Sequence, residues 1–127
     1  MKYRRLILPV LALMAALVQG FGAAAQARAD ALVIIRFNQP RVYYEKPLYG
    51  AVTKAVAAKP GVMFDLVSYV PLVADPKHNA GWQATSRQNA QAVMNSLRRM
   101  GVPASRISYR TVPVRDALYD EVHLFVR

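Results

Sequence analysis

The sequence predicts an α+β fold, a two-layer sandwich in which two helices lie on one face of a four-stranded mixed sheet. Two segments carry apolar residues at spacings of three and four, as amphipathic helices do, and four short segments have the composition of strands. Their order is strand, helix, strand, helix, strand, strand. A helix between two strands allows those strands to lie parallel through a right-handed crossover. We expect the last two strands to pair as a hairpin-like edge.

The N-terminal 29 residues have the pattern of a secretion signal. Basic residues between Met1 and Arg5 precede the uncharged run Leu6–Val18, which is short for a membrane-spanning helix. Alanines at positions 25, 27 and 29 have the small-x-small pattern of cleavage sites before Arg28 or before Asp30. We favour the second position, which leaves residues 30–127 as the mature domain. The alternative is an uncleaved anchor that tethers the domain to the inner membrane. Both interpretations place the folded part in the periplasm.

The composition of the mature chain narrows its function. About 98 residues suffice for one domain with a single core. Removal of residues 1–29 takes away four of the 17 basic residues and none of the seven acidic ones, which leaves a formal charge of +6. Export makes nucleic acid an unexpected partner, so the charge indicates an anionic envelope surface or a solvated basic face. The absence of Cys excludes a disulfide and a lipidated cysteine.

The first strand and the first helix follow the predicted cleavage site. Residues 31–38 form a nearly continuous apolar run, which is typical of a strand covered on both faces. The segment 45–58 is amphipathic, with Leu48, Val52 and Val56 four residues apart, and it ends before Lys59-Pro60-Gly61.

The second strand is expected at residues 62–70. Asp65 within it requires an exposed position or a polar partner, because an isolated buried carboxylate is costly. Residues 71–81 have the turn chemistry of a loop, with Asp75-Pro76 and Asn79-Ala80-Gly81.

The second helix has the strongest pattern in the chain. Its apolar stripe is formed by Ala90, Val93, Met94, Leu97 and Met100. Thr85 and Gln88 have the spacing of a capping box at its start. Gly101 suits a left-handed residue at its end, and Pro103 bars further helix. Residues 107–111 and 122–126 alternate as the two remaining strands, with a loop or short helical turn at 113–120.

The C-terminal half resembles the OmpA-like domain, the peptidoglycan-associating module of outer-membrane and flagellar stator proteins. The residues that carry the resemblance are Leu97, the stretch Gly101-Val102-Pro103-Ala104-Ser105-Arg106-Ile107 and the terminal Glu121–Val126. The resemblance implies the same two-layer βαβαββ fold. It also implies a ligand, the diaminopimelate residue of the peptidoglycan stem peptide, held by an aspartate after the second strand and an arginine on the helix.

The chain departs from the family at both of these ligand positions. Counted from the strand, the aspartate position falls on Pro71; the nearest acid is Asp75, four residues later. The arginine position holds Asn89. The resemblance therefore implies a weakened site, with Asp75, Ser86, Arg87 and Asn89 as its candidate residues.

No catalytic or metal-binding pattern is evident. His78 and His123 have no metal-ligand spacing, and no nucleophile elbow, phosphate-binding glycine loop or paired carboxylates occur, so we predict a non-enzymatic domain without metal or cofactor. Asp75 and His78 are open to interpretation as an acid–base pair or as a solvated pair on a loop. Trp82 and the pair Tyr43-Tyr44 could stack on sugar rings or belong to the core.

Two functions remain. One is a degenerate OmpA-like fold that serves as a structural or protein-interaction piece of an envelope assembly, such as a secretion or motility apparatus. The other is a peptidoglycan-binding module that anchors to the cell wall through stem-peptide diaminopimelate. The expected partners of the domain under these two functions are envelope proteins or peptidoglycan. We favour the first because a zwitterionic ligand requires an opposite charge for each of its own charges, and one of these is missing.

Overall fold

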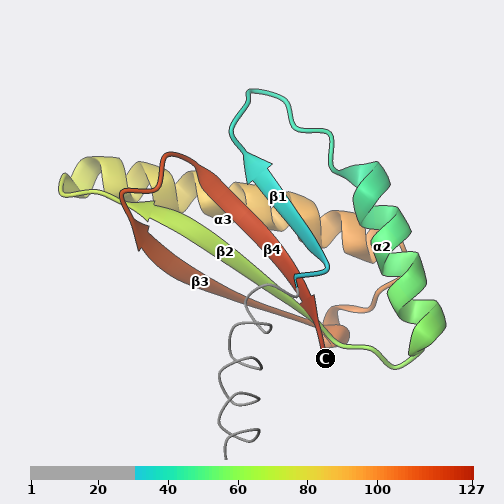
Figure 1. The fold of residues 1–127 in the computed structure, drawn as a ribbon. Coiled ribbons are helices and arrows are strands. Elements are labelled where there is room, and N and C mark those ends of the chain that lie inside the picture. The colour runs from blue at the N-terminus through green and yellow to red at the C-terminus, as the bar shows by residue number, and fades with distance from the viewer. Residues whose placement is uncertain (1–30) are drawn as a thin grey trace, which may run out of the picture. The chain divides into compact units, whose positions relative to one another are not determined.

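The computed structural model describes residues 31–127, which form one compact unit. The predicted signal peptide lies outside the described residues. The elements follow in the order β1 (Val33–Phe37), α2 (Glu45–Ala58), β2 (Phe64–Leu72), α3 (Pro76–Arg99), η1 (Ala104–Arg106), β3 (Ile107–Arg115) and β4 (Asp120–Val126), shown in Figure 1. Within this range, neither helix is long and apolar enough to span a bilayer.

The four strands form one mixed sheet in the order β1-β4-β2-β3. β4 is antiparallel to both of its neighbours, β1 and β2, which are therefore parallel to each other, and β2 is parallel to β3. The predicted hairpin-like pairing of the last two strands is wrong. After β3 the chain passes β2, and β4 inserts between β1 and β2. This order suits the side chains: Val122 and Leu124 of β4 are buried, as in a central strand, whereas those of β3 are exposed or half-buried, as in an edge strand.

Both helices pack on the same face of the sheet, as predicted, and share one hydrophobic core with it. α2 contributes Leu48 and Val52, and α3 contributes Ala90, Val93 and Leu97, which pack with Phe64, Leu66, Val122 and Leu124 of the sheet. α3 runs along β2 and β4, whereas α2 lies at the β1 side of the sheet (Figure 1). Val56 was expected in the core, but it is 38% exposed because it lies on the border of the buried stripe of α2.

The expectation that the first strand is covered on both faces is also wrong. In β1 only Ile35 is buried, while Ile34 and Arg36 are exposed. The helices cover one face only, and β1 is an edge strand, so alternate side chains of its apolar run face away from the core.

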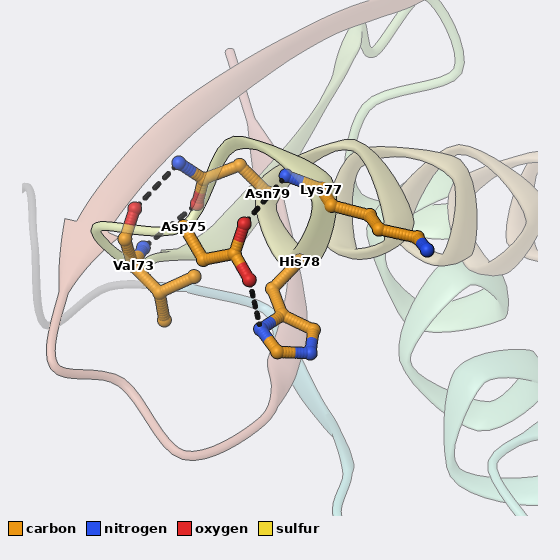
Figure 2. Close-up of polar contacts among 5 residues, drawn as sticks. All are labelled: Val73, Asp75, Lys77, His78 and Asn79. Atoms are coloured by element: carbon orange, nitrogen blue, oxygen red, sulfur yellow. Dashed lines mark hydrogen bonds and ion pairs between the residues drawn. The ribbon is translucent and has the colours of Figure 1, made fainter.

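The N-cap of α3 lies ten residues before Thr85, where the capping-box pattern placed it. Asp75 is its N-cap, accepting the backbone N–H of Lys77 at 3.0 Å, and Pro76 occupies the first turn, where its missing N–H costs nothing. The Asn79 side chain fixes the segment before the helix: its amide accepts from the N–H of Val73 at 2.7 Å and donates to the C=O of Val73 at 2.5 Å (Figure 2). The predicted loop at residues 71–81 is therefore wrong, because its second half is the start of α3. Gly101 ends the helix with φ 96°, as predicted.

β3 continues beyond its predicted end at residue 111 to Arg115. Pro113 lies within it, opposite Val70 of β2. A proline is tolerated here because β3 pairs with a neighbour on one side only, so its outer edge needs no donor.

Asp65 has the partner that its position required. Arg127 donates through Nε to both carboxylate oxygens, at 2.8 and 2.9 Å, and the Ser108 hydroxyl donates as well. Burial alone would raise the pKa of Asp65, but the bonds from Ser108 and Arg127 and the charges of Arg127 and Arg110 outweigh it and lower that pKa. The pair ties the C-terminal residue to β2.

Candidate functional site

A cleft of about 330 Å³ opens between the first half of α3 and the edge strand β3. Its lining consists of Val70, Pro71 and Leu72 at the end of β2, Tyr109, Thr111 and Pro113 of β3, and Asn79, Gln83 and Arg87 of α3. The three helix residues are four apart and share one face. The three β3 residues share the helix-facing side of the sheet, yet they are exposed, because α3 packs over β2 and β4 and leaves β3 uncovered.

The cleft combines apolar walls with one positive charge. Arg87 is the only charged lining residue, and Thr111, Tyr109 and Gln83 add hydroxyl and amide groups. The amide of Asn79 is already bonded to Val73. With no carboxylate in the lining, the cleft suits a neutral or anionic ligand of the size that small clefts accommodate.

A buried polar cluster lies beneath the same half of α3. Asn89 Nδ2 donates to Asp120 Oδ2 at 3.0 Å, and Asp120 is fully buried at the start of β4. Asp120 Oδ1, Ser86 Oγ and Ser68 Oγ are also buried and have no hydrogen-bond partner among residues 31–127. No cation of the described chain pairs with Asp120.

The environment of Asp120 opposes its ionisation. Burial raises the pKa of the Asp120 carboxyl, the nearby Asn89 and Ser86 side chains act in the opposite direction, and the negative charge of Glu121 raises it further. A carboxyl in such a position favours its protonated form more than an exposed one does.

The structure separates the four candidate residues that the resemblance indicated. Asp75 caps α3 and also meets His78 Nδ1 at 3.0 Å, and both of these side chains are largely exposed (Figure 2). Asn89 lies fourteen positions further along the same helix, about 21 Å from Asp75 at 1.5 Å per residue. Ser86 is buried beside Asn89, and only Arg87 lines the cleft. Asp75 and Asn89 cannot hold the two ends of one small ligand.

No family model matches the chain, and no curated protein matches it either. The resemblance to OmpA-like domains therefore stays a prediction from the residues quoted above, and the function has to be argued from the site.

Sequence reasoning missed Asp120 and most of the cleft. Asp120 is two residues before Val122 and four before Leu124, so the alternation that predicted β4 already placed it on the core-facing side. Ser86 likewise precedes Ala90, Val93 and Leu97 at helical spacing. Tyr109 and Thr111 carried no signal, because their place in the cleft depends on how far α3 covers the sheet.

Two other polar groups lie outside the cleft. His123 Nε2 meets Glu121 Oε1 at 2.8 Å, and its ring packs on Tyr69 at a centroid distance of 4.3 Å, on the sheet face away from the helices.

Among residues 31–127 no three His, Cys, Asp or Glu side chains are grouped as metal ligands would be. Trp82 is half-buried, Tyr44 packs edge-on against Phe37, and Tyr43 is 82% exposed, so Tyr43 is the most accessible of the three to a ligand.

Proposed function

We propose that this chain is a non-enzymatic domain of the bacterial cell envelope that serves, in the periplasm, as a protein-interaction piece of an envelope assembly such as a secretion or motility apparatus. Its recognition surface is the cleft between α3 and β3. The observation that carries the proposal is the composition of that cleft: apolar walls, one arginine and an uncovered edge strand, without a carboxylate.

An extended segment of a partner protein fits this arrangement. β3 is nine residues long and, among the described residues, pairs only with β2, so its outer backbone groups are available to an added strand. Side chains of such a strand would reach the apolar walls, and Arg87 would pair with a carboxylate of the segment. Pro113 removes one donor and restricts the addition to the first part of β3.

The cleft also supports a binding role over catalysis. Arg87 and Tyr109 are its only ionisable lining residues, which leaves no carboxylate or imidazole positioned there as general acid or base. Asp75 and His78 form an exposed pair outside the lining.

Peptidoglycan binding is the second candidate, and one observation favours it. Pro71, which stands where the resemblance places the family's aspartate, lines the same cleft as Arg87. Arg87 could therefore take the carboxylate of a stem peptide. The ammonium group of diaminopimelate would have no counter-charge beside Arg87. Asp75 lies outside the lining, twelve positions before Arg87 or about 18 Å along the helix, and Asp120 is buried and bonded to Asn89.

In-cell photo-crosslinking and sacculus sedimentation separate the two candidates. A photoreactive phenylalanine derivative replaces Tyr109 in the cleft or, as the matched control, the exposed Tyr43 outside it. We expect a discrete protein adduct from position 109 that is absent from position 43. Arg87→Ala should weaken that adduct on the order of tenfold or more, as expected for loss of a hydrogen bond to a charged group.

Sedimentation with purified sacculi tests the peptidoglycan candidate directly. We expect the wild-type protein to stay in the supernatant. Pelleting that Arg87→Ala abolishes would establish the peptidoglycan candidate in place of the first. Pelleting that Asp75→Ala abolishes would contradict the placement of the site in the cleft altogether.

A further inference from the structure

A second, separate groove lies at the other side of the domain, between the C-terminal half of α2 and the end of the sheet where β1 starts and β4 finishes. It has a volume of about 340 Å³, and its floor is apolar, formed by residues such as Leu32, Ala55, Val62 and Val126. Val126 remains 41% exposed. The groove shares no lining residue with the cleft between α3 and β3.

Three basic side chains border this groove, and no acidic side chain does. Lys54 and Lys59 are exposed, and neither forms an ion pair with the described residues. Arg127 is the third, and its ion pair with Asp65 offsets its charge, so Lys54 and Lys59 supply the uncompensated positive charge. The single acid of α2, Glu45, lies at the opposite end of that helix and pairs with Arg99 at 3.4 Å. The local field therefore favours an anionic partner.

The position of the groove in the chain indicates which anionic partner. Leu32 is the second described residue, so the groove adjoins the point where the N-terminal segment joins the domain. That segment contains the apolar run Leu6–Val18 behind three basic residues, the pattern of an exported chain. Whether the segment is cleaved or kept, an exported domain meets the anionic phospholipid of the envelope membranes.

We propose that this groove and its basic border dock the domain on an anionic phospholipid surface. Lys54, Lys59 and Arg127 lie against the headgroups, and the apolar floor receives the upper part of an acyl chain or the glycerol region. Two weak contributions act together, the electrostatic attraction and the burial of apolar area, as in other peripheral membrane contacts. The proposal does not depend on the cleft or its partner.

Vesicle sedimentation of the exported protein, purified as the cell delivers it, tests this proposal. The vesicles contain phosphatidylglycerol in phosphatidylcholine, with pure phosphatidylcholine as the neutral reference. We expect preferential binding to the anionic vesicles that weakens with added salt. The double variant Lys54→Gln/Lys59→Gln should reduce the partition coefficient about 30-fold, since one basic residue near an anionic surface contributes about fivefold.

The matched control is Arg110→Gln/Arg115→Gln, which removes the same charge from exposed positions on β3, at the other edge of the sheet. This variant should bind within about twofold of wild type. A further variant, Ala58→Glu, adds a carboxylate at an exposed lining position and should lower binding without affecting the core. Circular dichroism confirms that each variant is folded.

Three outcomes would overturn the proposal. Equal binding to neutral and anionic vesicles would remove the electrostatic part, and binding unaffected by the Lys54 and Lys59 changes would place the contact elsewhere. An equal loss in the Arg110 and Arg115 control would mean that net charge alone is responsible. Because these measurements contain no partner protein and no sacculi, they leave the proposed role of the cleft independent of their result.

Discussion

The two halves of the interface between α3 and the sheet are built from opposite materials. In the C-terminal half, Val93 and Leu97 pack with Phe64 and Leu66, and all four residues are essentially inaccessible to solvent. From the middle of α3 toward its N-terminus, the sheet-facing positions hold polar side chains: Ser86, Ser68 and Asp120 are buried, and Asn89 is half-buried. Ser86, Ser68 and one carboxylate oxygen of Asp120 have no hydrogen-bond partner among the described residues. A single helix thus has one end that is well packed and one end that is energetically costly.

This difference indicates how the domain divides stability from recognition. Apolar burial in the C-terminal half, here called the closed end, supplies most of the favourable free energy of the interface between α3 and the sheet. The polar end supplies less, because a buried hydrogen-bonding group without a partner costs about 1–3 kcal/mol. The cleft lies at this polar end, so the region proposed to bind a partner is also the one with the lower local stability, as is common for binding regions.

Truncation at the closed end should have the largest effect. Leu97→Ala removes a fully buried side chain from the core and should lower the free energy of unfolding by about 2–5 kcal/mol. Ser86→Ala, on the same stripe but at the polar end, removes a hydroxyl without a hydrogen bond and should change stability by less than about 1 kcal/mol. Urea denaturation measures both, and equal effects would contradict the contrast between the two halves.

The pH dependence of the polar end comes next in size. The raised pKa of Asp120 means that its contribution to stability is fully present below the pKa of the unfolded chain and is lost as pH rises through the folded pKa. Asp120→Asn keeps an acceptor for Asn89 and has no charge to bury. We expect the variant to match wild type near pH 3.5 and to exceed it by roughly 1–3 kcal/mol near pH 7.

Denaturation of both proteins across this pH range isolates Asp120, because other titrating groups are common to the two. Asp65 has the opposite sign, since its lowered pKa makes its contribution disappear as pH falls, and it cancels in the difference. A variant that is less stable than wild type at pH 7 would show that the Asp120 charge is compensated, which the contacts of the described chain do not predict.

The sequence predicted the elements better than their arrangement. Both helices and all four strands were expected, because hydrophobic spacing of 3.6 and of two residues is a local property. The position of β4 between β1 and β2 was missed, because strand order depends on which strand buries most surface, and a four-residue connection from β3 is compatible with a hairpin. The cleft was missed for the same reason, since it is formed by segments brought together only by the sheet order.

Within the candidate site, local and distant information differ in the same way. Arg87 was named as a candidate from the resemblance, and its place on α3 followed from the helix pattern. The contact between Asn89 and Asp120 joins residues 31 positions apart and had no local signal. The start of α3 was misplaced because Asp75-Pro76 is equally typical of a turn and of an N-cap followed by a first helical residue.

The start of α3 provides the smallest effect and completes the contrast, because the polar half of the helix rests on it. Asp75→Ala removes the acceptor for the Lys77 N–H and should destabilise the protein by about 1 kcal/mol, the usual effect of losing an N-cap. Thr85→Ala is the matched control, since Thr85 is an exposed residue inside α3 and not at its end. It should change stability by less than about 0.5 kcal/mol.

Hydrogen exchange adds a local readout, because Asp75→Ala should speed exchange near Asn79 while leaving Leu97 protected. A larger effect from Thr85→Ala than from Asp75→Ala would mean that the helix starts where the capping-box pattern placed it and that the segment before it, including the Asn79 and Gln83 side of the cleft, is a loop in solution.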